Sequence, residues 1–142
     1  MLQKKRGFTL VELVVVILIL GILAAVAAPK MFNASATATD NGLKQTLSVV
    51  RDAIELYAAE NNGSLPGQSG DLPGDLAPYL RGNFPTCPVG KKDATISYVT
   101  GQNITGDASP TTSWKYSKDY GEFIVNSTDA TASDSTVTYD QL

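Results

Sequence analysis

Glu12 is the residue whose type and position most strongly suggest a chemical role. It stands directly before residues 13–28, which contain sixteen positions without a polar side chain. A carboxylate inside an apolar, membrane-length segment costs roughly 2.5–3.5 kcal/mol on insertion scales, so an acid there indicates a function. The simpler interpretation is that Glu12, near the start of such a segment, reaches the membrane interface.

Other chemistry is limited by composition. The 142 residues include no histidine and one cysteine, which excludes hydrolases with a histidine base, His-ligated zinc or iron, and four-cysteine zinc sites. The formal charge of −3 argues against nucleic-acid binding. Cys87 lies between Pro85 and Pro88, and we expect a packed, buried thiol, with intermolecular pairing as the alternative. No catalytic constellation is present, and we expect no enzymatic activity.

The element that carries Glu12 is an apolar helix. Residues 8–28 form a mostly apolar run that stops before Pro29, and at about 1.5 Å per residue such a helix spans a bilayer core. Lys4, Lys5 and Arg6 directly precede it. By the positive-inside rule we expect the N-terminus in the cytoplasm and the residues beyond Pro29 on the far side of the membrane.

Three interpretations of this segment compete. A secretory signal peptide would be cleaved after a small-residue site such as residues 25–27, and a plain membrane anchor needs only the apolar run. Neither explains Glu12. Residues 4–12, KKRGFTLVE, closely resemble the type IV prepilin signature, which has a basic leader ending in Gly, then Phe, Thr, Leu, any residue and Glu. Pro29 also falls where that family has its helix-bending proline.

The resemblance implies specific roles. A prepilin peptidase would cut between Gly7 and Phe8 and methylate the new Phe8 amine. Glu12 would pair with the Phe8 amino group of a neighbouring subunit, so that two charges neutralise each other in an apolar environment. The chain would then comprise a leader (1–7), a transmembrane and filament-core half-helix (8–29), and a periplasmic globular domain (30–142).

The exported part has one helical pattern followed by strands. Leu43, Leu47, Val50 and Ile54 recur at helical spacing, and residues 61–63 read as a stop. A short helix is expected over residues 75–80 with Asp75 as N-cap, and a strand over 95–99. Residues 114–117 and 122–126 predict a hairpin. The stretch WKYSKDYGEFIVN resembles the C-terminal hairpin of the major pseudopilins of type II secretion systems.

Residues 127–142 contain few apolar anchors and are expected to form a solvated tail or an edge strand. The pseudopilin resemblance implies a calcium site here, because Asp129, Asp134 and Asp140 supply hard oxygen ligands. Their spacing does not match the expected loop, and no glycine marks a coordinating turn. We therefore expect no cofactor, with calcium at these aspartates as the alternative to a solvated acidic tail.

Together these patterns predict an α+β, pilin-like fold: a long, bent N-terminal helix packed on a small antiparallel sheet of three or four strands. The expected function is a structural subunit of a type II secretion pseudopilus in the inner membrane, with its C-terminus in the periplasm. Expected partners are copies of itself, prepilin peptidase, minor pseudopilins and an assembly platform. Alternatives are a type IV pilus subunit for adhesion, motility or DNA uptake, a secreted module with an ordinary signal peptide, and a membrane-anchored binding protein.

Overall fold

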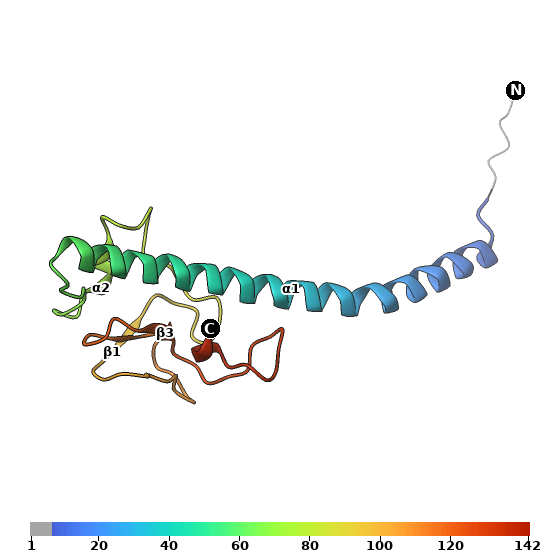
Figure 1. The fold of residues 1–142 in the computed structure, drawn as a ribbon. Helices are drawn as coiled ribbons and strands as arrows, with labels where there is room; N and C mark the ends of the chain where they lie inside the picture. The colour runs from blue at the N-terminus through green and yellow to red at the C-terminus, as the bar shows by residue number, and fades with distance from the viewer. Residues whose placement is uncertain (1–6) are drawn as a thin grey trace, which may run out of the picture. The chain divides into compact units, whose positions relative to one another are not determined.

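The computed structural model describes residues 7–142 (Figure 1). Of the predicted leader only Gly7 is among them, and Lys4, Lys5 and Arg6 lie outside the described residues. The chain divides into two units, the first ending at Ala36 and the second running from Thr37 to Leu142. Helix α1 (Leu10–Glu60) contributes to both. The long N-terminal helix predicted from the sequence is confirmed.

Helix α1 continues through Pro29 without a break in its helical assignment. Proline lacks the N–H that would bond to the carbonyl four residues earlier, and the bend expected there stays a prediction. At the other end, Gly63 donates its N–H to the carbonyl of Ala58 at 2.7 Å, while Asn62 has a φ of 56°. This is the Schellman pattern of a helix that ends on a left-handed residue. The predicted stop at residues 61–63 is confirmed.

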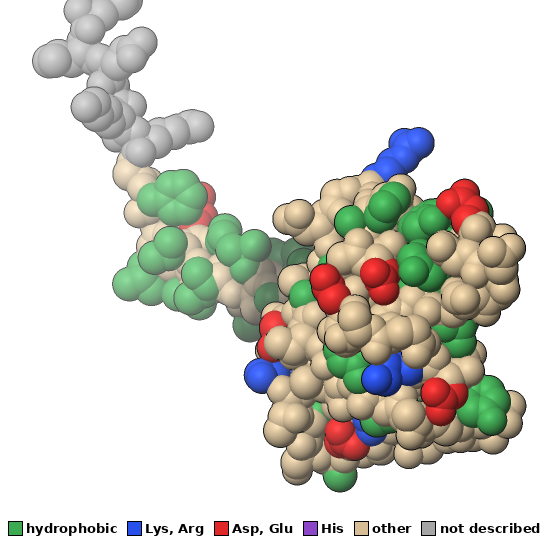
Figure 2. Space-filling model, turned by 90° about the vertical axis from the view of Figure 1, so that its left-hand side faces the viewer, with side chains coloured by type: hydrophobic (Ala, Val, Ile, Leu, Met, Phe, Trp, Pro, Cys, Tyr) green, Lys and Arg blue, Asp and Glu red, His purple; other side chains and the backbone are tan. Residues whose placement is uncertain are grey.

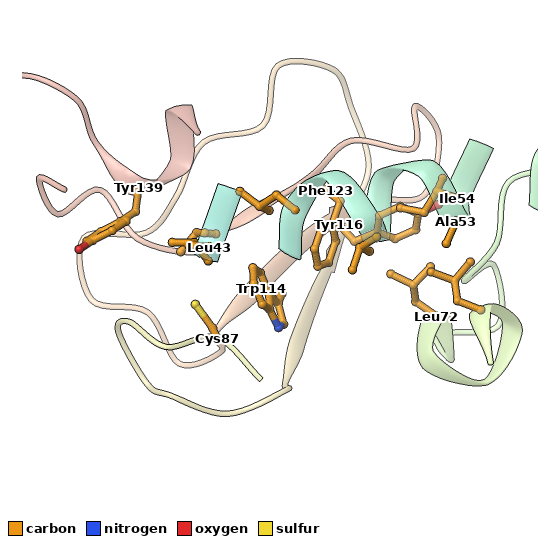
Figure 3. Close-up of a cluster of buried hydrophobic side chains, with 13 residues drawn as sticks. Leu43, Ala53, Ile54, Leu72, Cys87, Trp114, Tyr116, Phe123 and Tyr139 are labelled. Atoms are coloured by element: carbon orange, nitrogen blue, oxygen red, sulfur yellow. The ribbon is translucent and has the colours of Figure 1, made fainter. Parts of the chain in front are cut away.

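The second unit is built around one buried face of α1. The predicted stripe is confirmed, since Leu43 and Val50 are 0% exposed and Leu47 is 1% exposed. Figure 3 shows side chains of α1 beside Trp114, Tyr116 and Phe123 of the sheet. Burying a large apolar side chain contributes about 1.5–3 kcal/mol. This shared core fixes the sheet against the helix.

The sheet has three strands in the order β1 (Ile96–Val99), β2 (Trp114–Ser117) and β3 (Phe123–Val125). The predicted hairpin is confirmed, because β2 and β3 pair antiparallel with Tyr116 opposite Phe123. The expectation of a wholly antiparallel sheet is wrong, since β1 pairs parallel with β2. Residues 100–113 supply the crossover, and a connection of about a dozen residues is what parallel neighbours need.

The short helix lies earlier than predicted. Helix α2 is Leu72–Leu76, and its N-cap is Asp71, whose Oδ1 accepts the Gly74 N–H at 3.0 Å. Pro73 occupies the first turn, where a missing N–H has no cost. The expected N-cap, Asp75, instead accepts the N–H of Gly67 at 2.7 Å. Asp71 and Asp75 are both compatible with capping. Asp71 caps the helix, whereas Asp75 binds the loop that precedes it.

Residues 127–142 are not the solvated tail that their composition predicts. Tyr139 is 7% exposed and begins a short 3-10 helix, η1 (Tyr139–Gln141), and Ala130 forms an isolated bridge with Thr138. Arg51 of α1 donates from its guanidinium to the backbone oxygens of Phe123 and Leu142, each at 3.0 Å. One buried aromatic ring and hydrogen bonds to Arg51 and Asp40 of α1 replace the missing apolar anchors.

Candidate functional site at the start of the apolar helix

The predicted cleavage point lies outside regular structure. Gly7, Phe8 and Thr9 precede the first helical residue, and the Phe8 side chain is 79% exposed. Apart from its chain neighbours, no atom of residues 7–142 lies within 4 Å of the position that a Cβ on Gly7 would occupy. A backbone segment without secondary structure or packed neighbours can be bound by a protease. The geometry thus leaves the bond between Gly7 and Phe8 accessible.

Thr9 and Glu12 form a capping box at the N-terminus of α1. Glu12 Oε2 accepts hydrogen bonds from the Thr9 N–H at 2.8 Å and from the Thr9 hydroxyl at 2.7 Å. In return, the Glu12 N–H donates to Thr9 Oγ1 at 3.2 Å. This reciprocal arrangement satisfies two of the amide groups that a helix start leaves unpaired. It also places a carboxylate at the positive end of the helix dipole.

The capping box gives Thr9 a role that the sequence analysis did not assign. The sequence contains the pattern for this role, because Thr-x-x-Glu before an apolar run is typical of a helix N-terminus. Only Oε2 of the carboxylate is engaged, and Oε1 of Glu12 accepts no hydrogen bond from any residue between 7 and 142. One oxygen thus remains available to a donor from outside the described residues.

The helix that follows is not covered by any other part of the described chain. From Leu10 to Phe32 its large apolar side chains are each at least 45% exposed, and Figure 2 shows them gathered on the first unit. Helix α1 contains a stretch long and apolar enough to cross a membrane, and none of that stretch is buried. Apolar area of this extent requires lipid or other helices around it.

The three candidate calcium ligands do not form a cluster. Asp129 Oδ2 accepts from the Ser127 hydroxyl at 3.0 Å, Asp134 Oδ1 from the Thr136 N–H at 2.9 Å, and Asp140 Oδ2 from the Gly106 N–H at 2.8 Å. Across residues 7–142, no three acidic or cysteine side chains are grouped as a metal site would require. The expectation of no cofactor, with calcium at these aspartates as the alternative, stays a prediction.

Cys87 is buried at 1% exposure and forms no disulfide. Burial raises the pKa of its thiol, which lowers the population of the reactive thiolate. The predicted packed thiol is confirmed. Its N–H donates to the carbonyl of Asp93 at 2.9 Å, so the residue helps to fix the loop that leads into β1.

Comparison with known proteins finds similarity over this part of the chain. Residues 2–28 match the family model described as the prokaryotic N-terminal methylation motif. The chain is 40% identical over 74 residues to prepilin peptidase-dependent protein D of Escherichia coli, covering 51% of each chain. It is 34% identical over 61 residues to type II secretion system core protein G of Klebsiella pneumoniae, covering 43% of this chain and 44% of that protein.

A third relative aligns over more of its length. Competence protein ComGC of Halalkalibacterium halodurans is 32% identical over 93 residues, which is 63% of this chain and 83% of that protein. The chain therefore belongs to the family of type IV prepilin-like proteins, which includes the pseudopilins. It spans about half the length of the first two relatives. No solved structure matches it.

Proposed function

We propose that this protein is a structural subunit of a type II secretion pseudopilus, which polymerises through its N-terminal helix to help drive protein export. The proposal rests on one observation. The apolar part of α1 is capped at its start, is exposed along its length and directly follows an accessible Gly7–Phe8 bond. Similarity to type II secretion system core protein G supports the choice of system. In this proposal the chain is not an enzyme.

The first step is processing at the membrane. A prepilin peptidase cuts between Gly7 and Phe8, and the new Phe8 amine is methylated. Because the cut removes only the leader, the apolar helix stays on the mature chain and holds it in the inner membrane. The globular domain lies in the periplasm, in keeping with the cations that precede the helix.

The second step is assembly. The mature Phe8 amine of one subunit pairs with Glu12 of its neighbour, where Oε1 accepts no hydrogen bond from residues 7–142 and Oε2 stays in the capping box. Bringing the two charges together removes the cost of holding either one alone among apolar side chains. The same apolar surface contacts lipid before assembly and neighbouring helices after it. Minor pseudopilins and an inner-membrane platform are the further partners that we propose.

Mass spectrometry of the purified mature chain tests the processing step. A chain that begins at N-methylated Phe8 is expected. A mature chain that begins at Ala28 would show cleavage by signal peptidase and would overturn the proposal, because the apolar helix would be lost. Replacement of Gly7 by a bulky residue should block processing, while Lys30→Gln, beyond the apolar helix, should leave it unchanged.

A type IV pilus subunit is the second candidate, favoured by the competence protein that aligns over most of its own length. The two candidates share processing and polymerisation and differ in what the filament does. Deletion of the gene, followed by assays of exoprotein secretion, twitching and transformation, separates them. A defect confined to secretion supports the pseudopilus. A defect in twitching or DNA uptake with normal secretion supports the pilus.

A further inference from the structure

The large apolar side chains of the second unit are buried or partly buried, except for three. Between Thr37 and Leu142 the exposed large hydrophobic residues are Val49 at 51%, Leu56 at 49% and Tyr120 at 55%. Val49 and Leu56 lie seven positions apart on α1, which places them on the same side of the helix. Tyr120 belongs to the turn between β2 and β3.

Val49 lies in a groove of about 440 Å³ between α1 and residues 79–85. We call it the Val49 groove; its walls include Gln45 and Thr46 on the helix side, and Tyr79 and Arg81 on the other. A volume of this size falls in the range that accommodates small ligands or a single large side chain. The Arg81 side chain is exposed and forms no ion pair with any residue from 7 to 142.

Residues 118–121 form a hydrogen-bonded turn, which we call the Tyr120 turn. Gly121 donates its N–H to the carbonyl of Ser117 at 2.9 Å, and the Gln68 side chain donates to the carbonyl of Lys118 at 2.8 Å. Asp119, at the tip, is exposed and has no ion-pair partner in the described chain. A preorganised turn carrying an aromatic ring and an unpaired carboxylate loses little conformational entropy when it binds.

The groove and the turn lie on opposite flanks of α1. Tyr120 lines a hollow together with Ala58, whereas Val49 lines the groove. Val49 and Ala58 are nine positions apart on α1, and at about 100° per residue their side chains project in opposite directions. A single molecule therefore cannot bring its own turn to its own groove. Two complementary surfaces on opposite sides make a heterologous contact, which forms open chains instead of closed dimers.

We propose that the Tyr120 turn of one copy docks in the Val49 groove of the next, with Tyr120 against Val49 and Asp119 paired with Arg81. The apolar ring covers the exposed part of the groove, and the two unpaired charges neutralise each other at its rim. The contact rests on the proposed function, since it joins copies that are already aligned by their apolar helices. It adds a lateral interface between globular domains.

Thiol cross-linking in membranes of cells that express the full chain tests the contact. Gln45→Cys places a thiol at the groove and Lys118→Cys places one beside the tip, and neither removes a proposed contact residue. A short bifunctional thiol reagent should join the two variants when they are co-expressed and give a ladder from a chain that carries both. The unaltered chain, whose single Cys87 is buried, is the control. Either single variant cross-linking to itself as efficiently would overturn the proposal.

Charge reversal tests the pairing. Arg81→Asp and Asp119→Arg should each lower the cross-link yield about tenfold or more, and the two changes together should restore it. Lys92→Asp, at another exposed cation, should leave the yield unchanged. Failure of the double reversal to restore the yield overturns the Asp119–Arg81 pair. Sedimentation of filaments from the same cells tests polymerisation, on which the proposed function depends, separately, since filaments without the cross-link refute only this contact.

Discussion

The main-chain N–H of Ser133 donates to Asp40 Oδ2 at 2.8 Å, across 93 positions of sequence. Asp40 is 1% exposed, and its other oxygen, Oδ1, is buried without a hydrogen-bond partner in the described chain. Burial by itself would raise the pKa of Asp40, but hydrogen bonding from Ser133, Tyr139 and Ala132 together outweighs it, and the pKa lies below its ordinary value. A buried carboxylate of α1 thus holds the C-terminal segment.

Removal of this carboxylate should release residues 130–138. Asp40→Ala is expected to lower the free energy of unfolding by about 1–2 kcal/mol, because the Ser133 N–H loses its acceptor. Asp40→Asn keeps an acceptor and should lose less. Hydrogen exchange of the detergent-solubilised chain measures the effect, with Asp52→Asn on the exposed face of α1 as the control. Unchanged protection at residues 130–138 in Asp40→Ala would contradict the tether.

Substitution of Glu12 by Gln separates two roles of that residue. Glutamine also completes a capping box, so Glu12→Gln should keep the helix start intact while removing the charge. If assembly depends on pairing with the Phe8 amine, Glu12→Gln should be processed normally and yet sediment as few filaments, as Glu12→Ala should. Filament formation at the wild-type level by Glu12→Gln would show that capping alone suffices. The N-terminal mass and sedimentation of each variant decide between these outcomes.

Thr9 provides the complementary test. Thr9→Ala removes the cap, and loss of an N-cap hydroxyl costs about 0.5–2 kcal/mol of helix stability. Thr9→Ser keeps the hydroxyl and should behave as the wild type. Thr9→Ala removes the hydroxyl that donates to Glu12 Oε2 and accepts from the Glu12 N–H, and it keeps only the main-chain N–H of residue 9. Filament yield should therefore fall in Thr9→Ala and not in Thr9→Ser. Equal yields from the two variants would show that the capping box has no part in assembly.

Local patterns account for the elements that the sequence predicts correctly. The α1 stripe follows from helical spacing, and the hairpin from alternation of Trp114 and Tyr116 with polar residues before a tight turn. The Thr9–Glu12 capping box is equally local and could have been read from Thr-x-x-Glu. Cleavage and pairing roles at the N-terminus came from resemblance to a family, because no single residue there identifies a substrate of a peptidase.

Contacts between distant segments account for the errors. The direction of β1 depends on hydrogen bonds such as Lys118 N–H to the Val99 carbonyl at 3.0 Å, which join strands on either side of the crossover. The packing of residues 127–142 depends on Asp40, Arg51 and the single ring of Tyr139. The spacing of apolar residues and the residue types of turns do not specify which distant segment a polar segment will contact.

A buried lysine in β2 makes stability depend on its partner. Lys115 is 8% exposed, and its Nζ donates to Asp107 Oδ1 at 2.6 Å and to the Thr105 carbonyl at 2.7 Å. Asp107→Ala should cost about 1–3 kcal/mol, because it leaves the ammonium buried with a single acceptor. Lys115→Met should cost less, since the half-exposed Asp107 can be hydrated. In denaturant unfolding, the double variant Asp107→Ala/Lys115→Met should be more stable than Asp107→Ala alone. The opposite order of stability would contradict this account.

Asp93 gives the fold a defined dependence on acid. Hydrogen bonds from Thr95 and Ser113 hold the pKa of Asp93 at about 2, below its ordinary 3.8. A carboxyl whose pKa is depressed by folding stabilises the folded state above its unfolded pKa, and this contribution is lost as the pH falls through its folded pKa. Asp93→Asn should therefore unfold more easily than the wild type at neutral pH, with the difference shrinking between pH 3.8 and about 2. Unfolding free energies of both chains across this range measure it, and a difference that stays constant down to pH 2 would show that charge on Asp93 contributes nothing.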